Sequence, residues 1–438
     1  MENQEVTYSY RDILGFYLPL FLNVGIITLT APLLNFGVSK AVEPGKALAA
    51  FGAAFSLTII YNSFIYTSLK VYNSHLRDRE SFCRILRVYL LLGSVGSLLF
   101  AAIGLTETGN HLFSFLFGLR ADTAAHAKEW MLWSSPVPVL VAVRCALQGV
   151  TTVYRNTLNN ALGTILRMVA VLTGVLVLIV LYPHRPGMAS GAAFSLAGLV
   201  ETLFLLSRTG EMRTFSTPTA VAAYDQPLTV FYILRFSAPL WISSIAWTGS
   251  FPIINYFIGN TASPEAGLAG FNVLRSLNVL LNSPLNSLMT VVLILGNAAS
   301  LLRVRTLGIV LGCALTILSY VFSLPSVHLP LLGTGFNLSG QALSWAGTST
   351  VFFMFFPVLL LVRFYYEGLF MRLKAPKVLG MAGGVRLGLL VLSGAVLTDL
   401  FPGVNGVMLG MVLIIIASAS DALFTAVAYE ISHRKAGS

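Results

Sequence analysis

Long apolar runs alternate with short polar segments along the whole chain of 438 residues. A helix that crosses a bilayer needs about 20 mostly apolar residues. The pattern therefore predicts an all-α, polytopic membrane protein with about twelve transmembrane helices. Their approximate bounds are 12–35, 46–70, 84–105, 129–153, 157–182, 188–207, 228–257, 265–296, 304–324, 341–371, 377–400 and 404–431.

The composition supports this reading. Hydrophobic residues make up 56% of the chain and charged residues 10%, and the mean hydropathy is +0.80. A soluble protein has about 25% charged residues, so lipid must cover most of this surface. The net charge of +10 falls mainly in short loops, which is typical of membrane topology signals. We expect the lipid bilayer as a partner, and no nucleic acid.

The loop charges also predict an orientation. Fifteen Lys and Arg lie in one set of loops and five in the other, and positive loops face the cytoplasm. Residues 1–10 are polar and carry no signal-peptide pattern. We therefore expect an integral protein of the plasma (bacterial inner) membrane with both termini in the cytoplasm.

An internal repeat relates the two halves of the chain. Sliding the sequence by 219 or 220 positions aligns rare residues that seldom match by chance. Six helices per copy is an even number, so both copies have one orientation and a pseudo-twofold axis lies along the membrane normal. We expect two lobes, 1–215 and 216–438, joined by the linker 208–227. The aligned pairs include Pro19 and Pro239, Asn35 and Asn255, Arg84 and Arg303, Pro138 and Pro357, Arg144 and Arg363, Gly149 and Gly368, Arg167 and Arg386, and Glu201 and Asp421.

Four of these residues are arginines inside predicted helices. Arg144 and Arg363 lie about 16 Å and about 14 Å from the cytoplasmic ends of their helices, and Arg167 and Arg386 are similarly internal. Charge at this depth costs at least about 2.5–3.5 kcal/mol and normally faces a partner or an aqueous cavity. One interpretation is a lining for a small anionic substrate, because a guanidinium matches phosphate and carboxylate groups. The other is ion pairing between helices.

Three acids inside the predicted helices are the candidate ion-pair partners or sites for a coupling proton or sodium ion. They are Glu201, Asp421 and Glu367, the last of which is placed to pair with Arg363 at i+4. The prolines Pro19, Pro239, Pro138 and Pro357 are candidate hinges or static kinks. Asn35, Asn62, Asn255 and Asn282 are candidates for substrate contact or interhelical hydrogen bonds.

Other classes of chemistry find no support in the sequence. The six histidines lack metal-ligand spacing, and no nucleotide-binding or hydrolase motif is present. The three cysteines, Cys83, Cys145 and Cys313, imply no disulfide framework. We expect no enzyme activity, no cofactor and no metal, and a monomer.

The six-plus-six plan with a proline in the first and seventh helices resembles the multidrug/oligosaccharidyl-lipid/polysaccharide (MOP) exporter superfamily. Several motifs are similar to the progressive ankylosis protein family within it. They are Leu34-Asn35-Phe36-Gly37, Ala50-Phe51-Gly52, Asn73-Ser74 with Arg77-Asp78-Arg79, and Phe355-Phe356-Pro357-Val358 through Val362-Arg363 to Gly368. This resemblance implies export of pyrophosphate, a nucleotide or citrate.

The leading hypothesis is a secondary transporter that exports a small polyanion by alternating access between the lobes. A lipid-linked sugar flippase would use similar arginines for its pyrophosphate group. A cation-coupled multidrug exporter would instead need acids in an apolar pocket. A scaffold or receptor is disfavoured by the paired charges within the membrane.

Overall fold

The fold is described by a computed structural model for residues 8–117, 119–215, 228–297, 299–336, 338–401 and 403–437. Every regular element in these ranges is helical. Eleven helices are long and apolar enough to cross a membrane, or twelve if the bent pair Ala121–Trp133 and Val137–Val153 forms one span. The predicted all-α class with about twelve spans is confirmed.

The chain divides into two compact units. The N-terminal unit is Leu18–Ser237, and the C-terminal unit is Met1–Tyr17 with Ala238–Ser438. Two helices, α1 (Tyr10–Ile27) and α10 (Val230–Gly259), therefore begin in one unit and continue in the other. The predicted border after residue 215 adjoins residues 216–227, which lie outside the described part of the chain.

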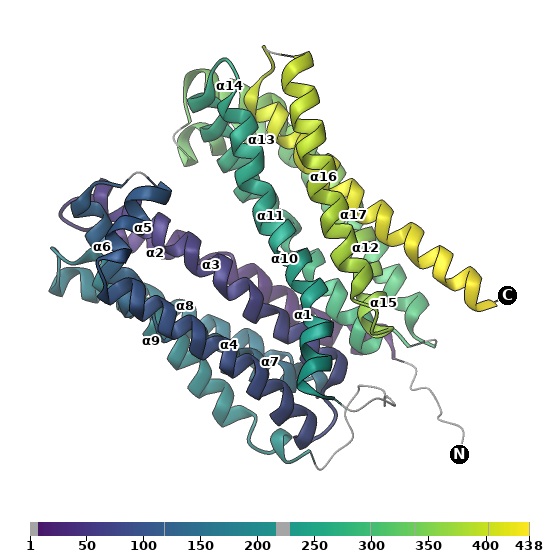
Figure 1. The fold of residues 1–438 in the computed structure, drawn as a ribbon. Coiled ribbons are helices and arrows are strands. Elements are labelled where there is room, and N and C mark those ends of the chain that lie inside the picture. Colours follow the sequence, from purple (N-terminus) through teal and green to yellow (C-terminus); the bar gives the residue numbers. More distant parts are fainter. Residues whose placement is uncertain are drawn as a thin grey trace. The chain divides into compact units, whose positions relative to one another are not determined.

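In the N-terminal unit, α3 packs against α6 and α7, and α7 also contacts α4 and α9. A core that includes Phe51, Phe113 and Trp130 lies among these helices. Figure 1 shows the unit in purple to blue-green. After α1 its helices are α2 (Thr30–Val38), α3 (Pro44–His75), α4 (Arg79–Leu105), α5 (Thr108–Phe117), α6 (Ala121–Trp133), α7 (Val137–Val153), α8 (Leu158–Leu181), α9 (Pro186–Arg208) and the 3₁₀ turn Met212–Thr214.

The C-terminal unit repeats this arrangement. Here α11 packs against α15, α15 contacts α12 and α17, and α16 contacts α17 as α8 contacts α9. The repeat found in the sequence is thus confirmed in element order and in neighbours within each unit. After α10 the helices are α11 (Pro264–Leu295), α12 (Leu301–Ser323), α13 (Pro325–Pro330), the π turn Leu331–Gly335, α14 (Gly340–Ser349), the 3₁₀ turn Thr350–Phe355, α15 (Phe356–Arg372), α16 (Lys377–Leu400) and α17 (Gly406–Gly437).

The repeat extends to backbone details. Arg155 and Lys374, which are 219 positions apart in the sequence, follow α7 and α15 with left-handed φ angles of 60° and 55°. Each ends its helix with the paired hydrogen bonds of a Schellman motif. A cation at this position also complements the negative end of the helix dipole.

Glycine permits the same close packing in both units. A Cβ atom on Gly149 would lie 2.5 Å from Cβ of Tyr72, and one on Gly368 would lie 2.6 Å from Cβ of Val292. These contacts join α7 to α3 and α15 to α11. Real Cβ atoms do not approach so closely, so the aligned glycines set the spacing of equivalent helix pairs.

The candidate hinge prolines fall into two groups. The boundary between the units falls after Tyr17 in α1 and after Ser237 in α10. Pro19 and Pro239 lie inside these helices, two positions after the boundary. Pro138 and Pro357 lie instead in the first turns of α7 and α15. A proline in a first turn removes no helical hydrogen bond. Pro138 follows the bend in its predicted helix, so its expected placement in a helix interior was wrong, whereas Pro357 lies within the single candidate span Gly340–Arg372.

The helical geometry of those two spans changes before each proline. The predicted helix 129–153 is divided between α6 and α7, which are bent by 42°. The predicted helix 341–371 is divided into α14, a 3₁₀ turn and α15.

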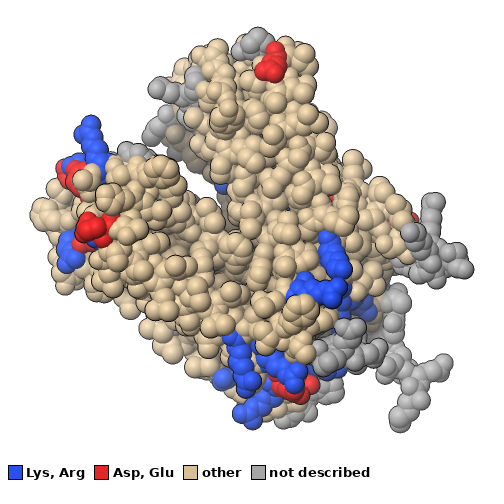
Figure 2. Space-filling model, viewed as in Figure 1, with Lys and Arg blue, Asp and Glu red and all other residues tan. Residues whose placement is uncertain are grey.

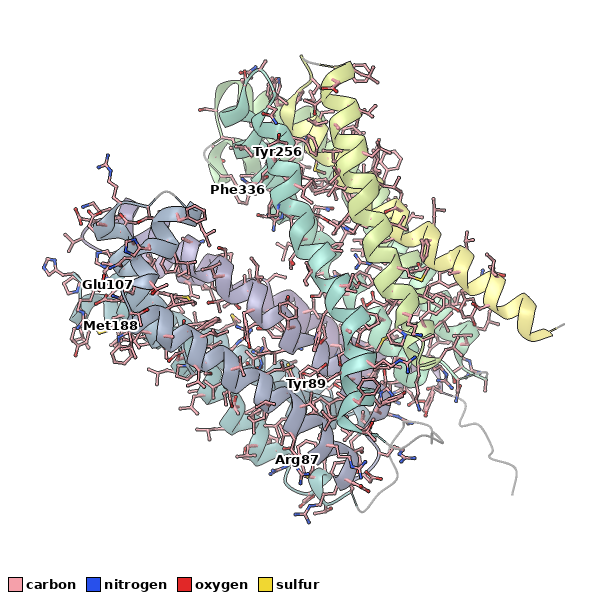
Figure 3. All side chains as sticks on the ribbon, in the orientation of Figure 1. Arg87, Tyr89, Glu107, Met188, Tyr256 and Phe336 are labelled. Atoms are coloured by element: carbon pink, nitrogen blue, oxygen red, sulfur yellow. The ribbon has the colours of Figure 1, made fainter. Side chains whose placement is uncertain are left out.

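Charged residues are placed as a membrane requires. On the visible faces the central surfaces of the helices are nearly free of Lys, Arg, Asp and Glu, which gather toward the ends (Figure 2). In the N-terminal unit, Arg87 and Glu107 lie near opposite ends (Figure 3). The deep charges are therefore exceptions that need partners.

Candidate functional site

Three helices of the N-terminal unit bring three charged side chains together. Glu201 on α9 accepts a hydrogen bond from Nη1 of Arg144 on α7, with 2.9 Å between the atoms. Nε of Arg167 on α8 lies 3.3 Å from the same carboxylate oxygen. All three residues are buried. Two arginines thus share one carboxylate, and the cluster has a formal net charge of +1.

Polar neighbours complete this cluster. Glu201 also accepts hydrogen bonds from Nε2 of Gln148 at 3.1 Å and from the hydroxyl of Thr164 at 3.3 Å. Arg144 donates to the hydroxyl of Tyr66 at 3.2 Å, and Arg167 donates to that of Thr30 at 3.4 Å. Because the carboxylate has three hydrogen-bond donors and a second ion-pair contact from Arg167, it is well compensated for its burial.

The equivalent helices of the C-terminal unit build a matching cluster. Nη1 of Arg386 on α16 donates to Asp421 on α17 at 2.7 Å. Nη1 of Arg363 on α15 lies 3.5 Å from the same oxygen. Arg386 also donates from Nε to the hydroxyl of Ser250 at 2.9 Å. Ser250 is 220 positions after Thr30, so the hydroxyl partner is repeated as well.

Two substitutions distinguish the C-terminal cluster. Glu367 stands where the first repeat has Gln148, and Arg275 stands where it has Phe55. The Glu367 carboxylate lies 4.0 Å from Nε of Arg363, which is the i+4 pair that the sequence predicts. With Arg275 counted, three arginines and two acids again give a formal net charge of +1.

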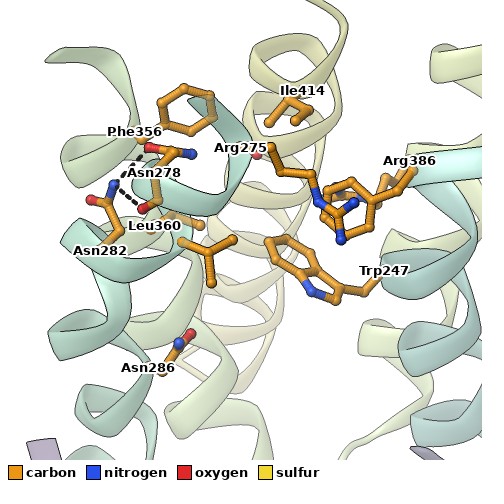
Figure 4. A pocket seen from close by; sticks show the side chains of 12 residues that line it. Trp247, Arg275, Asn278, Asn282, Asn286, Phe356, Leu360, Arg386 and Ile414 are labelled. Carbon is orange, nitrogen blue, oxygen red and sulfur yellow. Dashed lines mark hydrogen bonds between the residues drawn. The ribbon is translucent and has the colours of Figure 1, made fainter. Parts of the chain in front are cut away.

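A cavity opens beside the C-terminal cluster (Figure 4). The space in it that the centre of a water molecule can reach is about 40 Å³. The counterpart in the N-terminal unit, which Arg144 and Arg167 line, offers about 10 Å³. The larger cavity is lined by Trp247, Phe251, Arg275, Asn278, Val279, Asn282, Asn286, Phe356, Leu360, Arg386, Ile414 and Ser418.

Arg275 differs from the other deep arginines in its partners. Its guanidinium lies 3.6 Å from the centre of the Phe251 ring. Among the described residues it has no hydrogen-bond or ion-pair partner. Arg386 is 1% exposed, and its Nη2 atom has no hydrogen-bond partner in the described part of the chain. The cavity therefore has cationic donors that the protein itself leaves unused.

The predicted site residues are only partly brought together here. Arg386 lines the larger cavity, whereas Arg363 is held beside it by Asp421 and by a contact with the Trp247 ring at 4.4 Å. Neither Asn35 nor Asn255 lines either cavity.

Sequence reasoning missed Arg275 because it searched for charges repeated in both halves. Arg275 lies about 17 Å from the start of α11. Its depth within an apolar run was the signal that could have identified it.

The described residues hold no group of three or more His, Cys, Asp or Glu placed to bind a metal. Cys83, Cys145 and Cys313 are all free thiols. His75 lies beyond the predicted helix 46–70, but it is buried at the end of α3, where its ring contacts Phe236 with centroids 4.6 Å apart. The chemistry available at depth is therefore that of guanidinium, carboxylate and amide groups.

Solved structures share this fold over nearly the whole chain. MATE in the bent conformation has a TM-score of 0.75 at 15% identity and covers 98% of this chain and 97% of its own. The MATE multidrug transporter DinF-BH, in a complex with a bound compound, has a TM-score of 0.76 at 16% identity and covers 98% of this chain and 96% of its own. The chain has the MATE fold. No family model matches the sequence.

A third structure with the MATE fold differs in its pocket. A MOP superfamily transporter from Pyrococcus furiosus has a TM-score of 0.72 at 14% identity and covers 97% of this chain and 95% of its own. The binding pocket of that transporter is described as having reverse polarity, which suggests a different function for that protein.

Proposed function

We propose that this protein is a secondary transporter that exports a small anion by alternating access between its two units. The observation that carries the proposal is the excess of buried cations. In each unit the deep arginines outnumber the deep carboxylates by one, as counted above. A buried charge that lacks a counterion is costly, and a bound anion would supply that counterion.

The acids support the same choice. Glu201, Asp421 and Glu367 each lie against an arginine of their own unit. An organic cation would have to compete with these guanidinium groups for a carboxylate. Such competition disfavours the cation-coupled multidrug exporter, and it favours ion pairing over proton or sodium binding as the role of these acids.

One observation keeps multidrug export as the second candidate. The larger cavity has aromatic walls, Trp247, Phe251 and Phe356, which suit an amphipathic substrate. DinF-BH, which shares the fold, is a multidrug transporter. The charge of the transported compound therefore decides between the two proposals, and a lipid-linked pyrophosphate would fall on the anionic side.

The test is a flux assay with purified protein in liposomes. Pyrophosphate, ATP, citrate, 3-phenylpropionate and an organic cation are loaded side by side, and efflux is compared with that from protein-free liposomes. We expect efflux of one or more anions and none of the cation. Efflux of the cation alone would overturn the anion proposal and favour the multidrug exporter.

A further inference from the structure

The cavity of the C-terminal unit has a distinct arrangement of polar and apolar groups. Figure 4 shows Asn278 and Asn282 on one side, Arg386 and Trp247 on the other, and Leu360 between them. From this arrangement we infer that the cavity binds an organic monoanion with an apolar body, rather than a polyanion. The inference rests on the proposed function and names its substrate class.

The cationic side of the cavity provides the anion contacts. In the described part of the chain the guanidinium of Arg275 lies over the Phe251 ring and has no hydrogen-bond or ion-pair partner, and Nη2 of Arg386 is buried without a hydrogen-bond partner. Both residues line the cavity. A carboxylate placed here gains charge-assisted hydrogen bonds, and it relieves the cost of leaving guanidinium donors unpaired.

The charge balance limits the ligand to about one negative charge. Asp421 and Glu367 already balance two of the three arginines in and beside the cavity. A second or third ligand charge would have no cation to meet, and it would lie near Asp421, whose carboxylate is 2.7 Å from Nη1 of Arg386. Repulsion between like charges is strong where water is excluded. Pyrophosphate and citrate are therefore poor matches for this cavity.

The remaining walls define the rest of the ligand. Trp247, Phe356, Leu360 and Ile414 present apolar surface, which favours an aromatic or branched aliphatic body. Across the cavity, Nδ2 of Asn282 donates to Oδ1 of Asn278 at 2.8 Å, while Oδ1 of Asn282 is buried without a hydrogen-bond donor in the described part of the chain.

The first repeat lacks the parts that make this site. Phe55 replaces Arg275, Ile27 replaces Trp247 and Thr58 replaces Asn278. The corresponding cavity is smaller, as given above. The binding site is accordingly assigned to the C-terminal unit, and the Arg144–Glu201–Arg167 cluster is its structural counterpart.

Calorimetry on the full-length protein in detergent tests the assignment. The probes are 3-phenylpropionate, the neutral 3-phenylpropanol, the cationic 3-phenylpropylamine, and pyrophosphate. We expect 3-phenylpropionate to bind tightest. Arg275→Met should weaken its binding roughly ten- to a hundredfold, as for the loss of one charge-assisted contact. Arg275→Lys should weaken it less, because it keeps the charge and loses the flat fork.

The matched control is Arg305→Met, which removes an exposed arginine of α12. A melting temperature close to that of the wild type shows that each variant is folded. Tryptophan fluorescence gives a second measurement, since the change caused by 3-phenylpropionate should disappear in Trp247→Phe. This variant keeps all five deep arginines, so it also tests the location of the site if Arg275→Met does not fold.

Three results would overturn the inference. If pyrophosphate bound as tightly as 3-phenylpropionate, the monoanion class would be wrong while anion transport remained. If the affinity of Arg275→Met for 3-phenylpropionate equalled that of Arg305→Met, the site would lie elsewhere. If 3-phenylpropylamine bound tightest, both this inference and the proposed function would fail.

Discussion

Arg303 at the start of α12 donates a hydrogen bond from Nη1 to the backbone carbonyl of Tyr8, with 2.6 Å between the two atoms. Its aligned counterpart, Arg84 of α4, donates in the same way to the carbonyl of Leu228 at 3.1 Å. Tyr8 and Leu228 are themselves 220 positions apart. Each arginine thus anchors the segment that leads into the first helix of the other repeat. The segment before Pro19 or Pro239 is fixed in this way, which makes each proline a candidate pivot.

Removing these arginines should loosen the segments that they anchor. In Arg303→Met we expect the amides of residues 8–16 to exchange hydrogen faster, and in Arg84→Met those of 228–236. A hydrogen bond from a charged donor contributes about 1.5–3 kcal/mol, so exchange should increase roughly ten- to a hundredfold. Hydrogen exchange measured by mass spectrometry reports both segments. The control is Arg87→Met, which removes an exposed arginine of the same helix as Arg84. Unchanged exchange in both segments would show that the arginines do not hold them.

Adding a methyl group at the paired glycines should destabilise both units. In Gly149→Ala and Gly368→Ala the new Cβ atoms meet Tyr72 and Val292 at distances no pair of carbon atoms tolerates. Overpacking of this kind costs about 1–3 kcal/mol, so each variant should melt at a lower temperature. Gly384→Ala is the matched control, because nothing lies within 4 Å of its new Cβ. Equal melting temperatures for all three variants would contradict the role assigned to the aligned glycines.

Replacing Glu201 with Gln separates its two candidate roles. As an ion-pair partner, Glu201 compensates Arg144 and Arg167, and its neutralisation leaves two buried cations without a counterion. Breaking a buried pair costs about 3–5 kcal/mol, so we expect a clear fall in melting temperature. As a coupling site, the same change would leave stability intact and remove the dependence of transport on an ion gradient. Glu430→Gln, at an exposed position, controls for the loss of charge alone.

Much of this architecture follows from spacing in the sequence. Pairs such as Arg84 with Arg303 and Gly149 with Gly368 occur at a nearly constant offset. Each pair performs the same contact in its own unit. A residue repeated at a fixed offset makes an equivalent contact in each copy, which is why the repeat predicted the order and pairing of the helices.

The parts that escaped prediction depend on contacts across the fold. Sequence alone cannot show that Glu201 pairs with two arginines from two other helices, because this depends on how α7, α8 and α9 pack against one another. It also cannot separate a proline in a helix interior from one in a first turn, so the break before Pro138 was not predicted. Arg275 has no counterpart in the first repeat, so a search for symmetry passed over the residue that makes the two units differ.

The proposed orientation can be tested with single cysteines at exposed positions on opposite ends of the N-terminal unit. Ser207 lies near the end of α9 and Ala125 lies on α6, and both are exposed. The background is Cys83→Ser, because Cys145 is buried and Cys313 lies within the candidate span Leu301–Ser323, where a polar reagent does not reach it.

The excess of Lys and Arg in the loops on the Ser207 side predicts that this end faces the cytoplasm. In intact cells, a membrane-impermeant maleimide should therefore label Ala125→Cys and leave Ser207→Cys unlabelled. Inverted vesicles should give the opposite pattern, and solubilised protein should be labelled at both positions. Labelling of Ser207→Cys alone in intact cells would reverse the orientation. It would also turn the proposed export of an anion into uptake for the same conformational cycle.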